Sequence, residues 1–80
     1  MELKDTVELM TSEDYKERFR AEYWQTKIRY DRLMNMLERH DAGTLHFTLT
    51  ETEVLKQQAA AMRIYLYLLK ERAELEQIHL

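Results

Sequence analysis

Apolar residues recur at alternating steps of four and three through the first half of the chain. This spacing places them on one face of a helix, in the seven-residue repeat by which helices pack together. The predicted seam contains Phe19, Tyr23, Thr26, Tyr30, Leu33 and Leu37. Ser12 precedes Glu13 and Asp14, and a capping hydroxyl followed by first-turn carboxylates is typical of a helix start. We therefore predict a first long helix over residues 13–40.

A second helical repeat follows a short uncharged stretch. The only glycine, Gly43, comes directly after the first repeat, where a left-handed residue commonly ends a helix. Residues 42–50 alternate apolar and polar side chains, which predicts an extended connector that its apolar side chains pin to the helices. Thr50 and Glu53 have the spacing of a capping box, so we predict a second helix over residues 50–78. Its predicted seam contains Leu55, Gln58, Met62, Tyr65, Leu69 and Arg72.

Two long helices and a short connector predict an all-α, two-helix antiparallel hairpin over residues 12–80, preceded by a short N-terminal arm or helix over residues 1–11. The second helix is apolar on several sides, because Arg63 is the only charged residue between Ala59 and Leu69. One neighbouring helix covers only one of these sides, so we expect the hairpin to assemble as an oligomer. The predicted oligomer interface contains Met62, Ile64, Tyr65, Leu66, Tyr67, Leu68 and Leu69.

Composition excludes several classes of protein. The 80 residues include one glycine, no proline and no cysteine, which argues against hairpin-rich β folds, disulfide frameworks and zinc–thiolate sites. A formal net charge of −3 argues against a protein that coats long nucleic acids. No stretch approaches the ~20 apolar residues of a membrane span, and residues 1–5 lack the apolar core of a signal peptide. We therefore expect a soluble, unprocessed protein without membrane contacts.

Catalytic motifs are missing from the sequence. The three histidines, His40, His46 and His79, are scattered along the chain, and no metal-binding spacing or nucleophile motif accompanies them. We therefore expect a protein that is not an enzyme and that uses neither a metal nor a cofactor.

Basic and aromatic side chains are interleaved along the first helix, where Arg29 and Arg32 lie near Tyr23. Guanidinium groups pair with phosphate oxygens and aromatic rings stack on bases, so this mixture suits a nucleotide. In the connector, Thr44 and Thr48 offer hydroxyls near a helix start, a place where anions bind. A solvated helix face with aromatic residues in the core explains the same residues, as does an ordinary connector.

Two runs of residues have a more specific spacing. The second helix contains Leu55-x-x-Gln58-x-x-x-Met62-x-x-Tyr65-x-x-x-Leu69-x-x-Arg72, and the first contains Arg29-Tyr30-x-Arg32-Leu33-x-x-Met36-Leu37. Over residues 22–72 the chain resembles the helical-hairpin domain of a family of small phage proteins, first catalogued among crAss-like phages and shared by anti-CBASS and anti-Thoeris sponges. The resemblance implies a non-enzymatic oligomer, a hexamer in some members, which holds cyclic oligonucleotides or cyclised ADP-ribose messengers between its protomers.

Under this resemblance Arg72 matches the family arginine, and Arg29 and Arg32 occupy its basic positions. The resulting hypothesis is a phage counter-defence sponge in the cytoplasm of the infected bacterial host. It would bind and sequester a cyclic nucleotide immune signal without cleaving it, with arginines and hydroxyls on phosphates and a tyrosine on a base. The candidate ligand-binding residues are Tyr15, Tyr23, Arg29, Arg32, Thr44, Thr48 and Arg72.

Two alternatives remain open at this level. An anti-CRISPR-like inhibitor would use the same basic and aromatic face to bind a host defence effector directly. An inert oligomeric scaffold would need none of these side chains for function.

Overall fold

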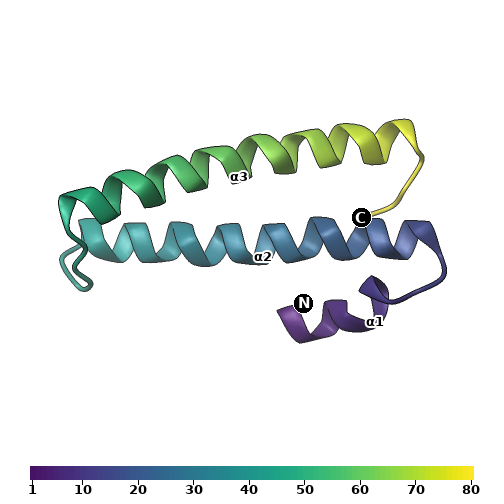
Figure 1. Ribbon diagram of the computed structural model, residues 1–80, viewed down its shortest axis with the longest axis horizontal. Helices are drawn as coiled ribbons and strands as arrows, with labels where there is room; N and C mark the ends of the chain where they lie inside the picture. Colours follow the sequence, from purple (N-terminus) through teal and green to yellow (C-terminus); the bar gives the residue numbers. More distant parts are fainter.

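The computed structural model describes residues 1–80, and most of them lie in two long antiparallel helices (Figure 1). α2 comprises Tyr15–Asp41 and α3 comprises Leu49–Leu75, each 27 residues long. The structure contains no strand, which confirms the all-α class. None of the helices combines the length and the hydropathy that crossing a membrane requires.

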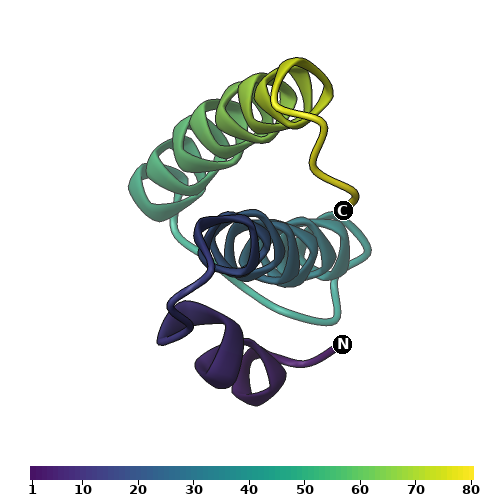
Figure 2. The ribbon, with the colours of Figure 1, turned by 90° about the vertical axis from the view of Figure 1, so that its right-hand side faces the viewer.

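The first residues of the chain pack on α2. A 3-10 helix, η1 (Leu3–Thr6), continues into α1 (Val7–Met10), and both lie on the opposite side of α2 from α3 (Figure 2). Thr6 is almost fully buried, and its hydroxyl oxygen accepts a hydrogen bond of 3.0 Å from the Gln25 side-chain amide. Consequently α2 has neighbours on two sides, whereas α3 has a neighbour on one.

The seam predicted for the first helix forms the core side of α2. Phe19, Tyr23, Leu33 and Leu37 are buried, and Thr26 and Tyr30 are half-buried. On α3 the observed seam differs from the predicted one. It contains Thr52, Leu55, Ala59, Met62, Leu66, Leu69 and Ala73, again in steps of three and four.

Half of the predicted α3 seam was therefore wrong. Gln58, Tyr65 and Arg72 are exposed, and their places against α2 are taken by the next residues along the chain, Ala59, Leu66 and Ala73. Burying a glutamine and an arginine costs the free energy of removing their polar groups from water, whereas alanine and leucine have no such cost. The two columns flank the shared column of Leu55, Met62 and Leu69, so steps of three and four fit either one.

The start of α3 is a capping box two residues before the predicted one. The Thr48 hydroxyl accepts a hydrogen bond of 3.1 Å from the Glu51 backbone amide, and the Glu51 carboxylate accepts one of 3.3 Å from the Thr48 amide. The prediction placed this box at Thr50 and Glu53. The Thr-x-x-Glu spacing occurs twice in succession here, and the backbone uses the first occurrence.

Replacing Thr48 by alanine is expected to lower the free energy of unfolding by about 1 kcal/mol, because the capping acceptor is lost. The matched control is Thr50→Ala, which removes an exposed threonine from the first turn and should change stability by less than about 0.5 kcal/mol. Urea denaturation followed by circular dichroism measures both. A larger loss of stability in Thr50→Ala than in Thr48→Ala would show that Thr50 is the capping residue, as predicted from the sequence.

Each long helix ends in a left-handed residue that reverses the chain. Gly43 has φ 82°, as its position in the sequence predicts, and the Thr44 amide donates to the Arg39 carbonyl at 2.9 Å. At the end of α3, Gln77 has φ 56° and the Ile78 amide donates to the Ala73 carbonyl at 2.8 Å. The second helix therefore ends at Leu75, three residues before the predicted end at Ile78.

The two chain segments outside the helices are attached by apolar side chains. In the loop between α2 and α3, Leu45 and Phe47 are half-buried as predicted, but Leu49 begins α3 and is 88% exposed. After α3, Ile78 is buried and Leu80 packs against the same core cluster, so the C-terminal residues return to α2 (Figure 1).

Candidate functional site

Two surfaces run along the α2–α3 seam, one on each side. In an antiparallel helix pair, equivalent heptad positions lie opposite each other, so residues seven apart line one side. One surface, here termed the arginine flank, contains Tyr15, Arg29, Gln58, Tyr65 and Arg72. The other, here termed the lysine groove, is lined by Tyr23, Lys27, Tyr30, Arg63, Leu66, Tyr67 and Lys70.

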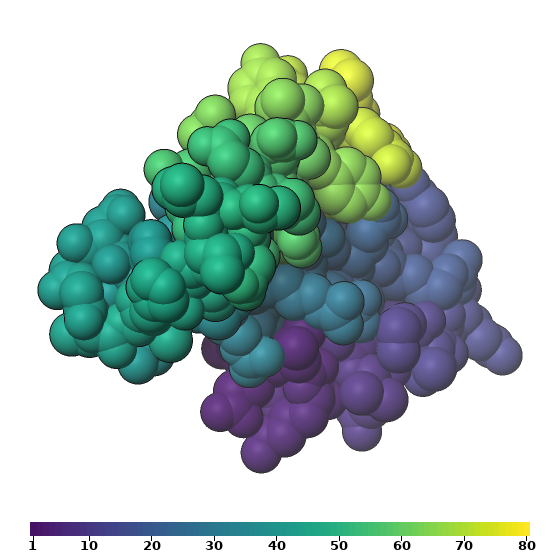
Figure 3. All heavy atoms as spheres, turned by 60° about the vertical axis from the view of Figure 1, so that its left-hand side comes forward, coloured from purple at the N-terminus to yellow at the C-terminus, as the bar shows by residue number.

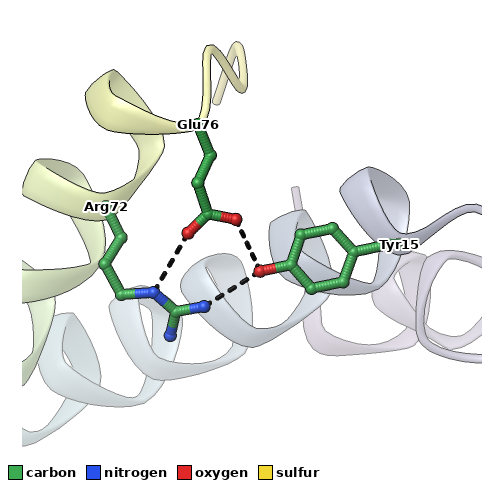
Figure 4. Close-up of polar contacts among 3 residues, drawn as sticks. All are labelled: Tyr15, Arg72 and Glu76. Atoms are coloured by element: carbon green, nitrogen blue, oxygen red, sulfur yellow. Dashed lines mark hydrogen bonds and ion pairs between the residues drawn. The ribbon is translucent and has the colours of Figure 1, made fainter.

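At one end of the arginine flank, Tyr15 from the start of α2 forms a hydrogen-bonded network with Arg72 and Glu76 from the end of α3 (Figure 4). The Arg72 Nη2 donates to the Tyr15 hydroxyl at 2.9 Å, and that hydroxyl donates to Glu76 Oε1 at 2.7 Å. Arg72 Nε also donates to Glu76 Oε2 at 3.2 Å. The Arg72 guanidinium lies 4.9 Å from the centre of the Phe19 ring. The fold thus brings together two of the predicted ligand-binding residues, Tyr15 and Arg72.

The network changes the proton affinity of its members. The hydrogen bond from Tyr15, together with the Arg72 charge, lowers the pKa of Glu76. The same carboxylate raises the pKa of the Tyr15 phenol and that of the Arg72 guanidinium. Arg72 is therefore already paired with a carboxylate, and its Nη1 is the terminal nitrogen that has no partner within the chain.

The titration of Glu76 provides a direct check of this network. Its carboxyl is expected to titrate below the ordinary 4.5, so the interaction stabilises the fold above that pH and is lost as pH falls through the lowered pKa. Tyr15→Phe removes the hydroxyl donor and should move the midpoint upward. Carbon-detected NMR of the side-chain carboxyl measures both midpoints, and the unmutated midpoint lying at or above 4.5 would contradict the network.

The remaining predicted ligand-binding residues on α2 differ in accessibility. Tyr23 is buried, with its ring packed against Trp24 at a centroid distance of 5.1 Å and an interplanar angle of 63°. Arg29 and Arg32 are exposed and form no ion pair or hydrogen bond within the chain. Tyr23 therefore belongs to the core and to the floor of the lysine groove, whereas the two arginines are free cations.

The predicted threonines lie at the other end of the molecule. Thr44 and Thr48 belong to the loop between the helices, far from Tyr15 and Arg72 at the opposite end of the hairpin, whose longest dimension is 43 Å (Figure 1). The Thr44 hydroxyl donates to the Arg39 carbonyl at 3.1 Å, and the Thr48 hydroxyl is used in the capping box. Within one chain, the structure does not bring the two threonines and Arg72 to a common site.

The lysine groove brings together three cations from both long helices. Lys27 comes from α2, and Arg63 and Lys70 come from α3; all three line a hollow of about 230 Å³. Lys27 pairs with Asp31 at 2.9 Å, whereas Arg63 and Lys70 have no ion pair or hydrogen bond within the chain. No carboxylate lines this hollow, so it is a positively charged site.

Tyrosine rings lie between these cations. Tyr30 and Tyr67 line the walls, and the Lys27 ammonium lies 6.0 Å from the centre of the Tyr30 ring. Tyr67 is 61% exposed, so its ring is accessible. The arrangement can bind a group that carries negative charge next to a flat ring, because ammonium and guanidinium groups pair with phosphate and tyrosine faces stack on bases.

The groove continues toward the loop as a second hollow of about 350 Å³. Lys56 lies there, together with Ala59 and Ala60, whose small side chains leave the space open. Glu38 and Asp41 also line this part, so the unbalanced positive charge is centred on the neighbouring hollow.

Sequence reasoning missed the groove, although a signal exists. Lys56, Arg63 and Lys70 follow one another at intervals of seven and thus share one side of α3. In the sequence, Arg63 stands out only as the single charge in an apolar run. Once Ala59, rather than Gln58, is placed on the seam, these three cations lie directly beside α2.

The predicted oligomer interface divides into two groups. Leu66 and Leu69 are buried in the core of the hairpin and Met62 is half-buried there, so their contacts are with α2. The other four residues, Ile64, Tyr65, Tyr67 and Leu68, are exposed, and Tyr67 among them lines the lysine groove. The surface open to another molecule is thus narrower than predicted. In the whole structure, no three His, Asp or Glu side chains are grouped so that they could hold a metal ion.

Comparison with known proteins identifies the family. The family model described as Sequestin matches residues 13–75, which include α2, the loop and α3. No curated protein and no solved structure matches the chain. Because the matched region spans well over half of the chain, and coincides with the hairpin that forms both surfaces, this protein belongs to the Sequestin family.

Proposed function

We propose that this protein is a phage counter-defence sponge that binds a cyclic nucleotide immune signal of the infected bacterium and sequesters it without cleaving it. The signal is of the cyclic oligonucleotide or cyclic ADP-ribose type. The family name denotes sequestration, and the resemblance of the two heptad runs implies the same class of ligand. The lysine groove is the observation that carries the proposal.

Charge supports an anionic ligand in the groove. Arg63 and Lys70 have no carboxylate partner within the chain, so a phosphate would be their first ion-pair partner rather than a replacement for one. The planar Arg63 guanidinium can bind two phosphate oxygens at once, and the Lys70 ammonium acts as a point charge. At Arg72, by contrast, the charge of the guanidinium is already partly neutralised by Glu76.

Shape supports a ligand with a flat ring that more than one copy encloses. Tyr67 and Tyr30 offer ring faces beside the cations. The hollow of about 230 Å³ continues into the adjoining hollow of about 350 Å³, so the groove reaches the roughly 300–1,000 Å³ of a typical ligand site. A ligand in this surface groove would be covered on one side only, which agrees with ligands enclosed between protomers of a homo-oligomer.

Isothermal titration calorimetry with cyclic di- and trinucleotides and cyclic ADP-ribose isomers tests the proposal. At least one of these compounds should bind, and heating the complex should release it with its mass unchanged. Release of a smaller product would mean that the protein is an enzyme. Binding of none of the compounds, together with capture of one host defence protein, would replace the sponge with a protein-binding inhibitor.

A further inference from the structure

A further hollow adjoins the lysine groove at the end that lies away from the loop. It has a volume of about 370 Å³ and lies between α2, the last turns of α3 and the residues that follow α3; it is here termed the tail hollow. Tyr23 and Lys70 line both the tail hollow and the lysine groove, so the two spaces lie next to each other. A ligand whose phosphate binds Lys70 can therefore extend into the tail hollow.

The residues that follow α3 form one wall of the tail hollow, and α2 holds them in place. The His79 carbonyl accepts a hydrogen bond of 2.6 Å from Arg20 Nε, and the Gln77 carbonyl accepts one of 3.5 Å from Lys16 Nζ. Ile78 between them is buried. In the space-filling view these residues, in yellow, lie against both the end of α3 and α2 (Figure 3). The wall is therefore formed without a ligand.

An aromatic ring and an unpaired carboxylate line the tail hollow. Trp24 is half-buried, and the Tyr23 ring packs against its indole at a centroid distance of 5.1 Å and an interplanar angle of 63°, which fixes the orientation of the indole. Glu74 forms no ion pair within the chain, although Lys70 lies one turn before it on α3. Both oxygens of the Glu74 carboxylate are thus available as hydrogen-bond acceptors.

The charges of the two spaces suit different parts of a nucleotide. No carboxylate lines the lysine groove, whereas Glu74 lines the tail hollow and repels a phosphate. A carboxylate instead accepts hydrogen bonds from N–H groups, and an indole stacks on a flat ring. Guanine has two neighbouring N–H donors on its Watson–Crick edge, at N1 and at the N2 amino group, whereas adenine has an acceptor at N1. The tail hollow therefore suits guanine better than adenine.

We propose that the tail hollow binds a guanine base, with Glu74 accepting hydrogen bonds from N1–H and the N2 amino group and Trp24 lying against the face of the base. Lys70 binds the adjoining phosphate. This inference rests on the proposed function, because the phosphate on Lys70 brings the base to the tail hollow. It narrows the messenger to a cyclic oligonucleotide that contains guanine.

Calorimetry with three cyclic dinucleotides that differ in their bases tests the inference. Cyclic di-GMP should bind most tightly, because its guanine has both donors. Cyclic di-IMP keeps N1–H but lacks the N2 amino group, and cyclic di-AMP lacks the N1–H donor as well. Each lost hydrogen bond to the carboxylate should weaken binding about 10-fold or more, so affinity should fall in that order.

A substitution at Glu74 assigns this preference to the tail hollow. Glu74→Gln replaces one acceptor oxygen by a donor, so it should lower the preference for cyclic di-GMP over cyclic di-AMP by about 10-fold or more without weakening cyclic di-AMP. The matched control is Glu71→Gln, because Glu71 is also exposed on α3 and does not line the tail hollow. An equal loss of preference in the control would assign the effect to net charge and overturn the site.

The ligand panel separates this inference from the proposed function. Equal affinity for cyclic di-GMP and cyclic di-AMP would overturn the guanine site and leave the sponge in place. Binding of cyclic ADP-ribose isomers alone would have the same meaning, since their base is adenine. Binding of none of these compounds would overturn both proposals.

Discussion

Replacing Arg63 and Lys70 together by alanine should weaken binding of the messenger by about 100-fold or more. Each cation is expected to donate a charge-assisted hydrogen bond to phosphate, worth about 1.5–3 kcal/mol, and about 1.4 kcal/mol corresponds to a tenfold change in affinity. Neither side chain has a partner within the chain, so the substitutions should leave the fold unchanged. Calorimetry with the compound that binds the unmutated protein measures the loss.

The matched control removes two positive charges from the other side of the hairpin. Arg29→Ala with Arg32→Ala lowers the net charge equally, and α2 positions these exposed residues away from the lysine groove. Salt screens the electrostatic effect of Arg29 and Arg32 on a ligand in the groove, because the screening length is about 8 Å at physiological ionic strength. Loss of binding in this variant, with binding retained in the Arg63 and Lys70 variant, would place the ligand on the surface of α2 that carries Arg29 and Arg32.

Replacing Leu69 by alanine should cause the largest loss of stability of any substitution discussed here. Leu69 is 1% exposed and packs with Phe19, Tyr23, Leu66 and Ile78. Emptying such a site costs about 2–5 kcal/mol, and a chain of this length has only about 4–12 kcal/mol in total. The variant should therefore be partly unfolded or close to it at 25 °C.

Urea denaturation followed by circular dichroism measures this loss. The control is Leu49→Ala, because Leu49 is 88% exposed in the first turn of α3 and has little apolar contact to lose. It should change the free energy of unfolding by less than about 0.5 kcal/mol. Equal losses in the two variants would contradict the position of Leu69 in the core.

Heptad spacing predicted the helices well because it reflects a physical requirement. On α2 the large apolar residues Phe19, Leu33 and Leu37 share one face, and burying them is favourable, so the face that packs on α3 could be identified. The end of the first helix at Gly43 was predicted equally well, since a left-handed residue at a helix end is commonly glycine. Gln77 occupies the same conformation at the end of α3 although glutamine is not typical of it, so no residue type marks the early end of α3.

The candidate site was harder to predict because it depends on which residues meet. α3 has apolar residues on both sides of the column that contains Leu69. Assigning Tyr65 rather than Leu66 to the seam therefore turns the helix face assigned to α2 by one heptad position. That rotation decides whether Arg63 and Lys70 lie beside α2. The Tyr15–Arg72–Glu76 network likewise joins the two ends of the chain, and no local pattern indicates it.

Native mass spectrometry of the protein purified from bacteria with an active messenger-producing cyclase reports both the number of chains in the assembly and the mass of any retained messenger. We expect an assembly of several chains that retains the intact messenger, whereas the Arg63 and Lys70 double variant should assemble without it. Unmutated protein that carries no messenger, or that carries only a smaller fragment of it, would contradict sequestration.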